Sequence, residues 1–317
     1  MACVAVIPAR RGEKTIGATL EALRLGNADF VSRVLVVTSR DDPTAAVVRA
    51  WVHRDAKVEL VESDHAMTAG AARNRGRDAA RARLPHASDG LADELLLFVD
   101  ADCRLEAGGA AAMAGELARR GAAALSARVA CCGGAIARAR HLLEFKEAAS
   151  RRPPPPSWLP PSTTLLCRAD AFDRAAGFPD LWPGEDLVFS QVLRSFGLAV
   201  LRSDTASTLH EHPRGVARMM RHQVRLGATA AIARKRVAMP GSAFAASRVA
   251  ALLLLPGRLW RLAQWQAGEG AAAMIEAVLL APLLVAGLAA WTAGFVSESG
   301  GARPRTAATA VRETQVA

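Results

Sequence analysis

The sequence predicts an α/β fold with a mostly parallel sheet and helices on both faces. Three observations indicate this class. Short apolar runs alternate with longer segments of helical periodicity through the first hundred residues. The runs are rich in Val, Ile and Leu, as buried strands are. Polar residues follow the runs directly, and ligands of such sheets bind beyond the carboxyl ends of the strands.

The elements follow in chain order. Strands are predicted at 1–7, 31–38, 58–61 and 95–99, and helices at 16–23, 47–54 and 69–83. Beyond Asp102 the pattern predicts helices at 107–120 and 187–196, with a strand at 125–129. The segment RRPPPPSWLPP at 151–161 has too many prolines for regular structure. It is interpreted as a loop near the site or a surface linker.

Composition narrows the function classes. Of 317 residues, 51% are hydrophobic and 22% charged, which excludes a disordered chain. The net charge of +10 suits an anionic partner. The five cysteines form no Cys-x-x-Cys pair and leave an odd number, so neither a disulfide framework nor a zinc site is expected, and a reducing compartment fits better.

The C-terminal third has a different character. Residues 277–296 are 20 consecutive uncharged residues, about the length of a membrane-spanning helix, and the alternative is a buried core helix. Residues 243–262 are apolar with flanking arginines and predict an interfacial or re-entrant helix, or a second membrane span. The expected organisation is a catalytic domain at 1–236, a membrane-associated helical region at 237–297 and a flexible tail at 298–317. The arginines before the apolar run place the catalytic domain on the cytoplasmic side of the cell membrane.

Two acidic pairs are candidate catalytic groups. Asp100 and Asp102 directly follow the strand LLLFV, where paired carboxylates hold a divalent cation that also contacts phosphates. The alternative is an ordinary polar strand end. Glu185 and Asp186 begin a predicted helix and offer a general base. The alternative is the electrostatic preference of acidic residues for helix N-termini.

Other polar residues stand near these pairs in the predicted topology. His210 could complete a metal shell. Asp41 and Asp42 close the second strand, either to accept hydrogen bonds from a ligand or as turn residues before a proline. The segment with Arg73 and Asn74 could face a diphosphate. A basic stripe at helical spacing suits diphosphate or anionic lipid and consists of Arg218, Arg221 and Arg225.

The order of these motifs is more specific than any one of them. The chain presents in turn VIPARRGEKTIGATLEAL, SRDD, AGAARNRG, LLFVDAD, RADAFDRAAGFPD, PGEDLVFSQVLRSFG and LHEHP. This order resembles the family-2 glycosyltransferases with the GT-A nucleotide-diphospho-sugar fold, a Rossmann-like architecture. The resemblance covers about residues 3–230 and is most specific over 168–197.

The resemblance implies a role for each matching position. The nucleotide-sugar would be bound by Pro8, Arg10, Asp41, Asp42, Arg73, Asn74 and Asp100. Asp102 and His210 would hold Mn²⁺ or Mg²⁺. Asp186 would be the catalytic base, with Glu185 beside it, in an inverting transfer of a sugar to an acceptor hydroxyl. The membrane segment makes a lipid or lipid-linked acceptor the expected one.

Departures from the family pattern leave other functions open. Ala9-Arg10-Arg11 replaces the usual residues after the first strand, and the motif Gln-x-x-Arg-Trp of processive members is absent. One alternative is a sugar nucleotidyltransferase, since VIPARRGEKTIG is similar to the loop of cytidylyltransferases for acidic sugars. Another is an inactive membrane-anchored scaffold. Nucleic-acid binding is not expected, because the basic residues adjoin an apolar segment rather than interleaved aromatics.

Overall fold

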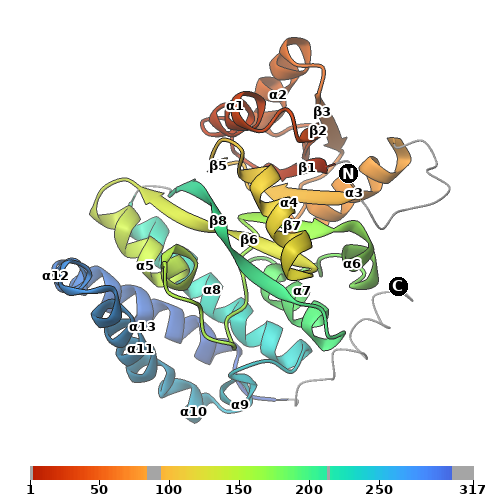
Figure 1. Ribbon diagram of the computed structural model, residues 1–317. Helices are drawn as coiled ribbons and strands as arrows, with labels where there is room; N and C mark the ends of the chain where they lie inside the picture. The colour runs from red at the N-terminus through yellow and green to blue at the C-terminus, as the bar shows by residue number, and fades with distance from the viewer. Residues whose placement is uncertain (1–2, 84–93, 213–214, 302–317) are drawn as a thin grey trace. The chain divides into compact units, whose positions relative to one another are not determined.

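The computed structural model describes residues 3–83, 94–212 and 215–301 (Figure 1). The chain forms two compact units, each made of two segments. Unit 1 comprises Met1–Ala130 and Leu159–His210, and unit 2 comprises Cys131–Trp158 and Glu211–Ala317. Of the predicted flexible tail, residues 302–317 lie outside the described residues. The predicted domain boundaries remain an expectation. The compact units divide the chain at a different place from the predicted boundary at 236, because the segment from 211 onward belongs to unit 2.

Eight strands of the described chain form one sheet in the order β3-β2-β1-β4-β7-β6-β8-β5. Pairing is parallel from β3 to β4 and antiparallel between β4 and β7, β6 and β7, and β5 and β8. The predicted α/β class is confirmed, whereas the antiparallel part was not indicated by the sequence. The strands are β1 (Cys3–Pro8), β2 (Val31–Ser39), β3 (Val58–Ser63), β4 (Leu95–Val99), β5 (Cys103–Leu105), β6 (Ala124–Cys132), β7 (Thr164–Arg168) and β8 (Val200–Glu211).

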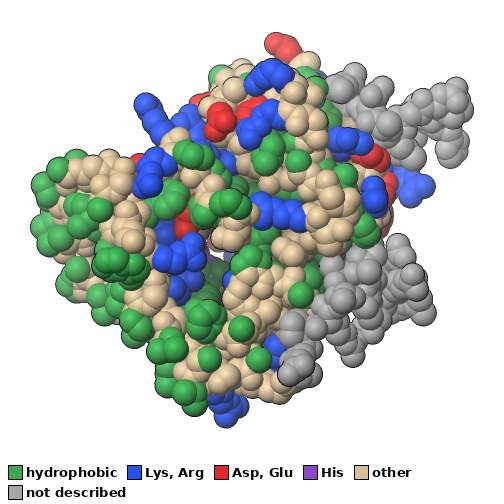
Figure 2. All heavy atoms as spheres, turned by 60° about the horizontal axis from the view of Figure 1, so that its bottom comes forward, with side chains coloured by type: hydrophobic (Ala, Val, Ile, Leu, Met, Phe, Trp, Pro, Cys, Tyr) green, Lys and Arg blue, Asp and Glu red, His purple; other side chains and the backbone are tan. Residues whose placement is uncertain are grey.

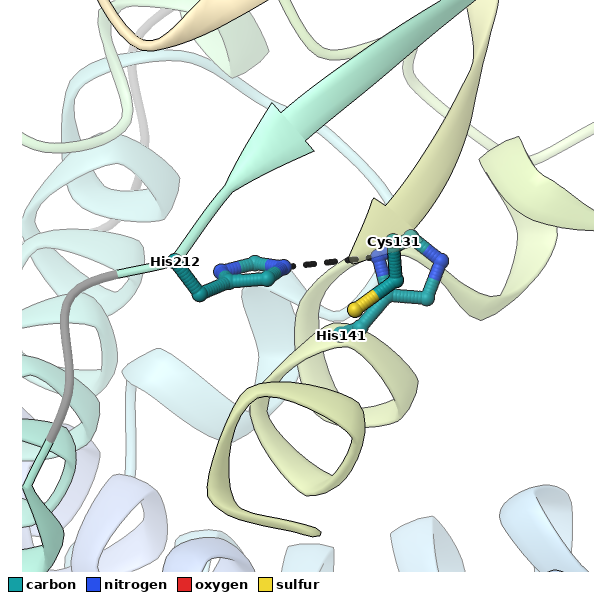
Figure 3. A group of neighbouring side chains, drawn as sticks. All are labelled: Cys131, His141 and His212. Atoms are coloured by element: carbon teal, nitrogen blue, oxygen red, sulfur yellow. Dashed lines mark hydrogen bonds between the residues drawn. The ribbon is translucent and has the colours of Figure 1, made fainter. Parts of the chain in front are cut away.

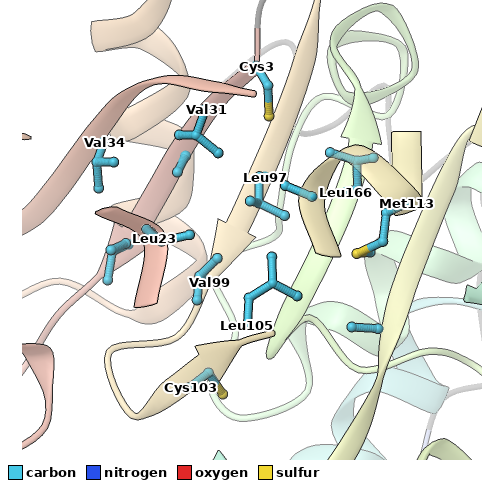
Figure 4. Packing of buried hydrophobic residues seen from close by; sticks show 14 of the residues in the cluster. Cys3, Leu23, Val31, Val34, Leu97, Val99, Cys103, Leu105, Met113 and Leu166 are labelled. Carbon is cyan, nitrogen blue, oxygen red and sulfur yellow. The ribbon is translucent and has the colours of Figure 1, made fainter. Parts of the chain in front are cut away.

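The two faces of the sheet follow from the alternation of side chains along each strand. On one face Ala5, Ile7, Leu97 and Val99 join a single buried cluster with Leu20 (Figure 4). Helices α1 (Ile16–Gly26), α2 (Pro43–Arg54) and α4 (Gly109–Arg120) supply its helical side chains. This cluster is the main core of unit 1.

The opposite face carries the helices nearest the candidate site. They are α3 (Ala69–Arg83), α6 (Ala169–Arg174) and α7 (Glu185–Ser195). A methyl group added at Gly76 of α3 would lie 2.3 Å from Val6 Cγ1, so glycine lets the helix lie close to β1. Phe98 of β4 contacts the rings of Phe172 and Phe178, each at 5.3 Å between centroids. Helices therefore cover both faces, as predicted.

Unit 2 is helical in the part that follows β8. Its helices are α5 (Ala135–Ala149), α8 (Val216–Arg236), α9 (Ser242–Ala245), α10 (Arg248–Leu252), α11 (Leu254–Glu269), α12 (Ala271–Leu279) and α13 (Ala281–Glu298). Helix α13 packs along α8 at two glycines. A Cβ at Gly227 would lie 1.8 Å from the Trp291 carbonyl oxygen, and one at Gly294 would lie 1.9 Å from that of Val224. The two backbones meet there without side chains between them.

The predicted membrane helices differ in extent from the helices observed. The segment 243–262 is divided among α9, α10 and α11, and 277–296 is interrupted at Leu280, where Pro282 lies in the first turn of α13. Helix α13 is the one described helix that is long and apolar enough to cross a membrane, and 39% of it is buried inside the protein. Its buried face includes Leu284, Leu288 and Phe295.

Candidate active site

Parallel pairing brings the carboxyl ends of β1, β2 and β4 to one edge of the sheet. Asp100 directly follows the end of β4, and Arg10 and Asp41 lie two residues after the ends of β1 and β2. A pocket opens at the ends of β1 and β2 and is lined by Ala9, Arg10, Val37, Thr38, Ser39, Ala66, Met67 and Ala72. The lining combines apolar side chains with Arg10, Thr38 and Ser39.

Asp41 and Asp42 have different surroundings. The buried Asp42 carboxylate accepts hydrogen bonds from Thr44 N at 2.9 Å and Arg11 N at 2.9 Å, and so caps α2. Burial opposes ionisation of Asp42, but the hydrogen bonds from Thr44 and Arg11 hold its pKa below the usual value. Asp42 thus fixes the turn after β1, while Asp41 is exposed to solvent.

Arg73 of α3 connects the two acidic pairs. Its guanidinium is 2.6 Å from Asp100 Oδ1 and 2.6 Å from Glu185 Oε1, and the residue is only 1% exposed. Burial disfavours its charge, but Asp100 and Glu185 keep the pKa of Arg73 above its ordinary value. A buried cation between two carboxylates must be held in place, because removing either partner leaves an uncompensated charge.

The two aspartates beside this arginine have raised pKa values. Burial, opposed by Arg73, raises the pKa of Asp100 to about 6, with a further contribution from Asp102. Burial and the adjacent Glu185 raise the pKa of Asp186 to about 7, against the opposing effect of Arg73. Asp186 accepts a hydrogen bond from Leu187 N at 2.9 Å. A carboxylate with a pKa near neutrality is suited to accept a proton from a hydroxyl group.

Asp102 and His210 form a potential metal site. The pairing of β5 with β8 sets Cys103 opposite His210, and His210 Nε2 lies 3.4 Å from Asp102 Oδ1. The Cys103 sulfur is also within 4.8 Å of these atoms, but burial raises the thiol pKa well above its usual value. The Cys103 side chain also belongs to the apolar cluster of unit 1. A carboxylate and an imidazole fit Mn²⁺ or Mg²⁺ and leave positions for water and phosphate oxygens.

Comparison with known proteins identifies the family. The sequence model "Glycosyl transferase family 2" matches residues 4–175, more than half of the chain. The chain belongs to glycosyl transferase family 2. This confirms the predicted family and enzyme class, a glycosyltransferase. No curated protein matches the sequence.

A solved glycosyltransferase structure shares the fold. A mannosyltransferase from Pyrobaculum calidifontis, PcManGT, determined with GDP-Man and Mn²⁺, is 18% identical with a TM-score of 0.59. The match covers 92% of this chain and 86% of that one. TarS from S. aureus (residues 1–349, with UDP-GlcNAc) is 16% identical with a TM-score of 0.49, over 71% of this chain and 66% of that one. The present chain therefore spans slightly less than two thirds of the length of this TarS fragment.

The Asn74 side chain of the glycosyltransferase forms hydrogen bonds with the protein backbone. Its amide donates to the Phe178 carbonyl at 2.8 Å and accepts from Phe178 N at 2.9 Å. A Cβ at Gly177, whose φ is +72°, would come within 2.5 Å of Asn74 Oδ1. Asn74 therefore holds the Gly177–Phe178 turn.

The structure brings most of the predicted residues of the glycosyltransferase to the same region of unit 1. Pro8 and Arg10 lie at the end of β1, and Asp100, Arg73 and Glu185 are joined by ion pairs. Sequence reasoning missed Ala66 and Met67, which line the pocket after β3. Because β3 pairs in parallel with β2, the residues that follow β3 lie at the same edge of the sheet. Their place after a predicted parallel strand could have indicated them from the sequence.

Proposed function

We propose that the protein transfers a sugar from a nucleoside diphosphate-sugar to a hydroxyl group of a lipid or lipid-linked acceptor, with inversion at the anomeric carbon. The observation that carries this proposal is the Arg73 network. Arg73 forms ion pairs with Asp100 and Glu185. Asp100 stands two residues before Asp102, and Glu185 is the neighbour of Asp186. Arg73 thus joins a carboxylate next to the candidate metal pair to a carboxylate next to the candidate base, in a family-2 glycosyltransferase.

The donor nucleotide would occupy the pocket at the ends of β1 and β2. Arg10, Thr38 and Ser39 line it, and the exposed Asp41 lies two residues after the end of β2. Arg10 offers a charged donor to phosphate oxygens, and Asp41 offers an acceptor to a base or ribose. The solved mannosyltransferase and TarS fragment were determined with GDP-Man and UDP-GlcNAc, which supports a donor of this class.

Asp102 and His210 would hold the divalent cation. When bound, the ion would offset the negative charge that develops on the diphosphate as it leaves. The Mn²⁺ of the mannosyltransferase complex supports a divalent cation here. Asp100 would orient the nucleotide-sugar from its position beside Arg73.

Asp186 would act as the base. It takes the proton of the acceptor hydroxyl, the hydroxyl oxygen forms a bond to the anomeric carbon, and the bond from that carbon to the diphosphate oxygen breaks. The electron pair of the broken bond leaves with the nucleoside diphosphate. Attack opposite the leaving group inverts the configuration. Glu185 would keep its charge paired with Arg73 and thereby hold the start of α7 in position.

A lipid acceptor is supported by the surface of unit 2. Large apolar side chains are exposed along α10, α11, α12 and α13: Val249, Leu252, Leu253, Trp260, Ile275, Val278, Leu279 and Val285. Figure 2 shows hydrophobic side chains gathered on this part of the molecule. The exposed Arg218, Arg221 and Arg225 of α8 add positive charge suited to anionic headgroups. We place the protein at the cytoplasmic face of the cell membrane.

The test is thermal stabilisation by nucleoside diphosphates (GDP, UDP, CDP, ADP and dTDP), each with and without Mn²⁺, on the full chain. A ligand that binds the native state raises the Tm. We expect one diphosphate to raise the Tm more when Mn²⁺ is present. Asp102→Asn should lose that Mn²⁺-dependent increment, while Asp64→Asn, an exposed aspartate paired with Arg40 at 3.2 Å, should keep it.

Other outcomes favour the alternatives. Cytidine triphosphate is measured beside the diphosphates, and stabilisation by this nucleotide alone would favour a nucleotidyltransferase. Absence of stabilisation by every nucleotide would contradict the proposal and favour the inactive scaffold. The matching nucleotide-sugar is then incubated with a polyprenyl phosphate or diacylglycerol acceptor, and the anomeric configuration of the product is determined by NMR. A product with retained configuration would contradict the inverting mechanism.

A further inference from the structure

Unit 2 contains a second cluster of metal-ligating side chains, made of one thiol and two imidazoles instead of carboxylates. Cys131 at the end of β6, His141 in α5 and His212 after β8 each bring one ligand atom within 4.8 Å of the others. Figure 3 shows the sulfur and the facing ring nitrogens directed toward one another. We call this the Cys131–His141–His212 cluster.

The spacing of the two imidazoles suits coordination to one ion. His212 Nε2 and His141 Nδ1 lie 3.4 Å apart. Ligand nitrogens about 2.0–2.1 Å from a tetrahedral Zn²⁺ are separated by about 3.3–3.4 Å. The same distance is long for a hydrogen bond between ring nitrogens. The two imidazoles are therefore spaced as a metal site requires, and the Cys131 sulfur lies within 4.8 Å of both facing nitrogens.

The surroundings also match a soft metal site. Both histidines are buried, and Cys131 is half-buried, which leaves a route for an ion. The Phe145 ring lies 5.8 Å from the His141 ring and 5.9 Å from the His212 ring, so the imidazoles are fixed by packing. Thiolate and imidazole are the ligands that Zn²⁺ prefers, whereas Mg²⁺ and Mn²⁺ prefer carboxylate oxygens.

We propose that the Cys131–His141–His212 cluster binds a zinc ion as a site separate from the Asp102–His210 pair. The sulfur of Cys131 and the facing nitrogens of the two histidines supply three ligands. Three protein ligands leave a fourth tetrahedral position for a water molecule. The site joins β6, α5 and the chain after β8, so zinc would stabilise this part of unit 2.

Binding changes the protonation of the ligands. Burial, with a smaller contribution from Cys132, raises the pKa of the Cys131 thiol to about 11, so the thiol carries its proton when no metal is present. Zinc binding forms the sulfur–zinc bond and releases that proton to solvent. The imidazole whose facing nitrogen carries the proton loses it to solvent and takes up a proton on its outward nitrogen, so that it binds the ion in the neutral form.

The test uses the full chain, stripped with EDTA and loaded with Zn²⁺ or Co²⁺ alone. We expect one zinc per chain by mass spectrometry of the metal content. We also expect a thiolate-to-cobalt charge-transfer band with Co²⁺. Cys131→Ser should lose the band, and His212→Gln should lower the zinc affinity by at least tenfold. Far-ultraviolet circular dichroism checks that both variants are folded.

Matched variants define the site. Cys132→Ser, at the neighbouring thiol, and His65→Gln, at an exposed histidine, should keep both zinc and the cobalt band. Asp102→Asn should keep them as well, which separates this site from the donor site. Loss of zinc in Asp102→Asn with retention in Cys131→Ser, or a folded wild-type chain that binds no zinc, would overturn the proposal.

Discussion

Arg73 illustrates, at the scale of single residues, how a buried charge couples stability to the site. Its guanidinium contacts Asp100 and Glu185 and lies 5.1 Å from the centre of the Phe178 ring. Arg73→Met removes the cation and leaves two carboxylates without their partner. We expect the free energy of unfolding to fall by about 3–5 kcal/mol. Urea denaturation followed by circular dichroism measures the change.

The control for Arg73 is on the same helix. Arg75 is exposed and donates to the Glu62 carbonyl at 2.7 Å. Arg75→Met should change the free energy of unfolding by no more than about 0.5 kcal/mol. If both variants lose the same stability, the loss reflects the helix and not the buried ion pairs.

Asp186 is expected to lower stability while it supports activity. The pKa of Asp186 is raised to about 7 in the folded protein. Between the lower pKa of the unfolded chain and pH 7, folding is therefore accompanied by uptake of a proton. Above that range the ionised carboxylate lowers the free energy of unfolding. Asp186→Asn removes this charge. Because the Asp186 side chain is partly exposed to solvent, we expect this substitution to raise the free energy of unfolding at pH 8 by only about 1 kcal/mol. Transfer activity should fall by at least a hundredfold.

The pH profile tests the same residue independently. A base must be deprotonated, so kcat/KM should rise with pH through about 7 and then level off. The groups that face Asp186 are Glu185 on its own helix and Arg73 on α3. Glu185→Gln removes the like charge and should move the midpoint to lower pH. A wild-type profile flat from pH 5 to 9 would contradict the assignment of Asp186 as the base.

The sequence predicted the carboxylates better than their partners. Asp100 and Asp102 directly follow an apolar strand, a local pattern that can be read in the chain. The engagement of Asn74 with Phe178 joins residues 104 positions apart, and the pairing of Arg73 with Glu185 joins residues 112 apart. No local pattern records such contacts. For the same reason the sequence did not separate the capping role of Asp42 from the exposure of Asp41.

At the scale of elements, the contact between α8 and α13 depends on glycine. A Cβ at Gly227 would overlap the Trp291 carbonyl oxygen, so Gly227→Ala must push the helices apart. We expect the free energy of unfolding to fall by about 1–3 kcal/mol. Chemical denaturation monitored by circular dichroism provides the measurement.

A helical glycine with free space around it provides the comparison. At Gly257 of α11 an added Cβ meets no atom within 4 Å. Gly257→Ala should therefore stabilise the protein by about 0.5–1 kcal/mol, because alanine favours the helix. The two glycine substitutions are expected to have opposite signs. A stability loss at both positions would show that the close approach is not the cause.

The sequence predicted helices and buried strands where their periodicity is local. It predicted β1 to β4 and α3 with boundaries near those observed, and it predicted parallel pairing among these strands. It did not indicate β5, β7 or the full length of β8, which are short or polar and depend on pairing with distant strands. The apolar run 277–296 was read as one helix, because hydropathy does not mark the break at Leu280.

At the scale of the whole molecule, the distribution of exposed apolar side chains predicts where a membrane binds. Val278 and Leu279 are 66% and 76% exposed on α12. We expect the full chain to float with vesicles that contain anionic phosphatidylglycerol and less with neutral phosphatidylcholine. Each apolar side chain removed from water contributes about 1.5–3 kcal/mol. The double variant Val278→Glu with Leu279→Glu should reduce flotation by at least tenfold.

The matched control has an exposed leucine outside this surface. Leu25 in α1 is 69% exposed, and Leu25→Glu should leave flotation unchanged. Equal loss in both variants would show that added negative charge, and not the apolar surface of unit 2, controls binding. Retention of the wild-type protein in membranes after carbonate washing would instead indicate that a helix crosses the bilayer.

The discontinuity of unit 2 has a consequence for synthesis on the ribosome. Leu143 of α5 packs against Gly287 of α13, yet the chain completes the second segment of unit 1 between them. The partner helix emerges about 140 residues later, which corresponds to about 7–28 s at 5–20 residues per second. During that interval the apolar side of α5 lacks its native cover. Nascent chains of intermediate length should therefore be the main clients of chaperones, more than chains that have released α13.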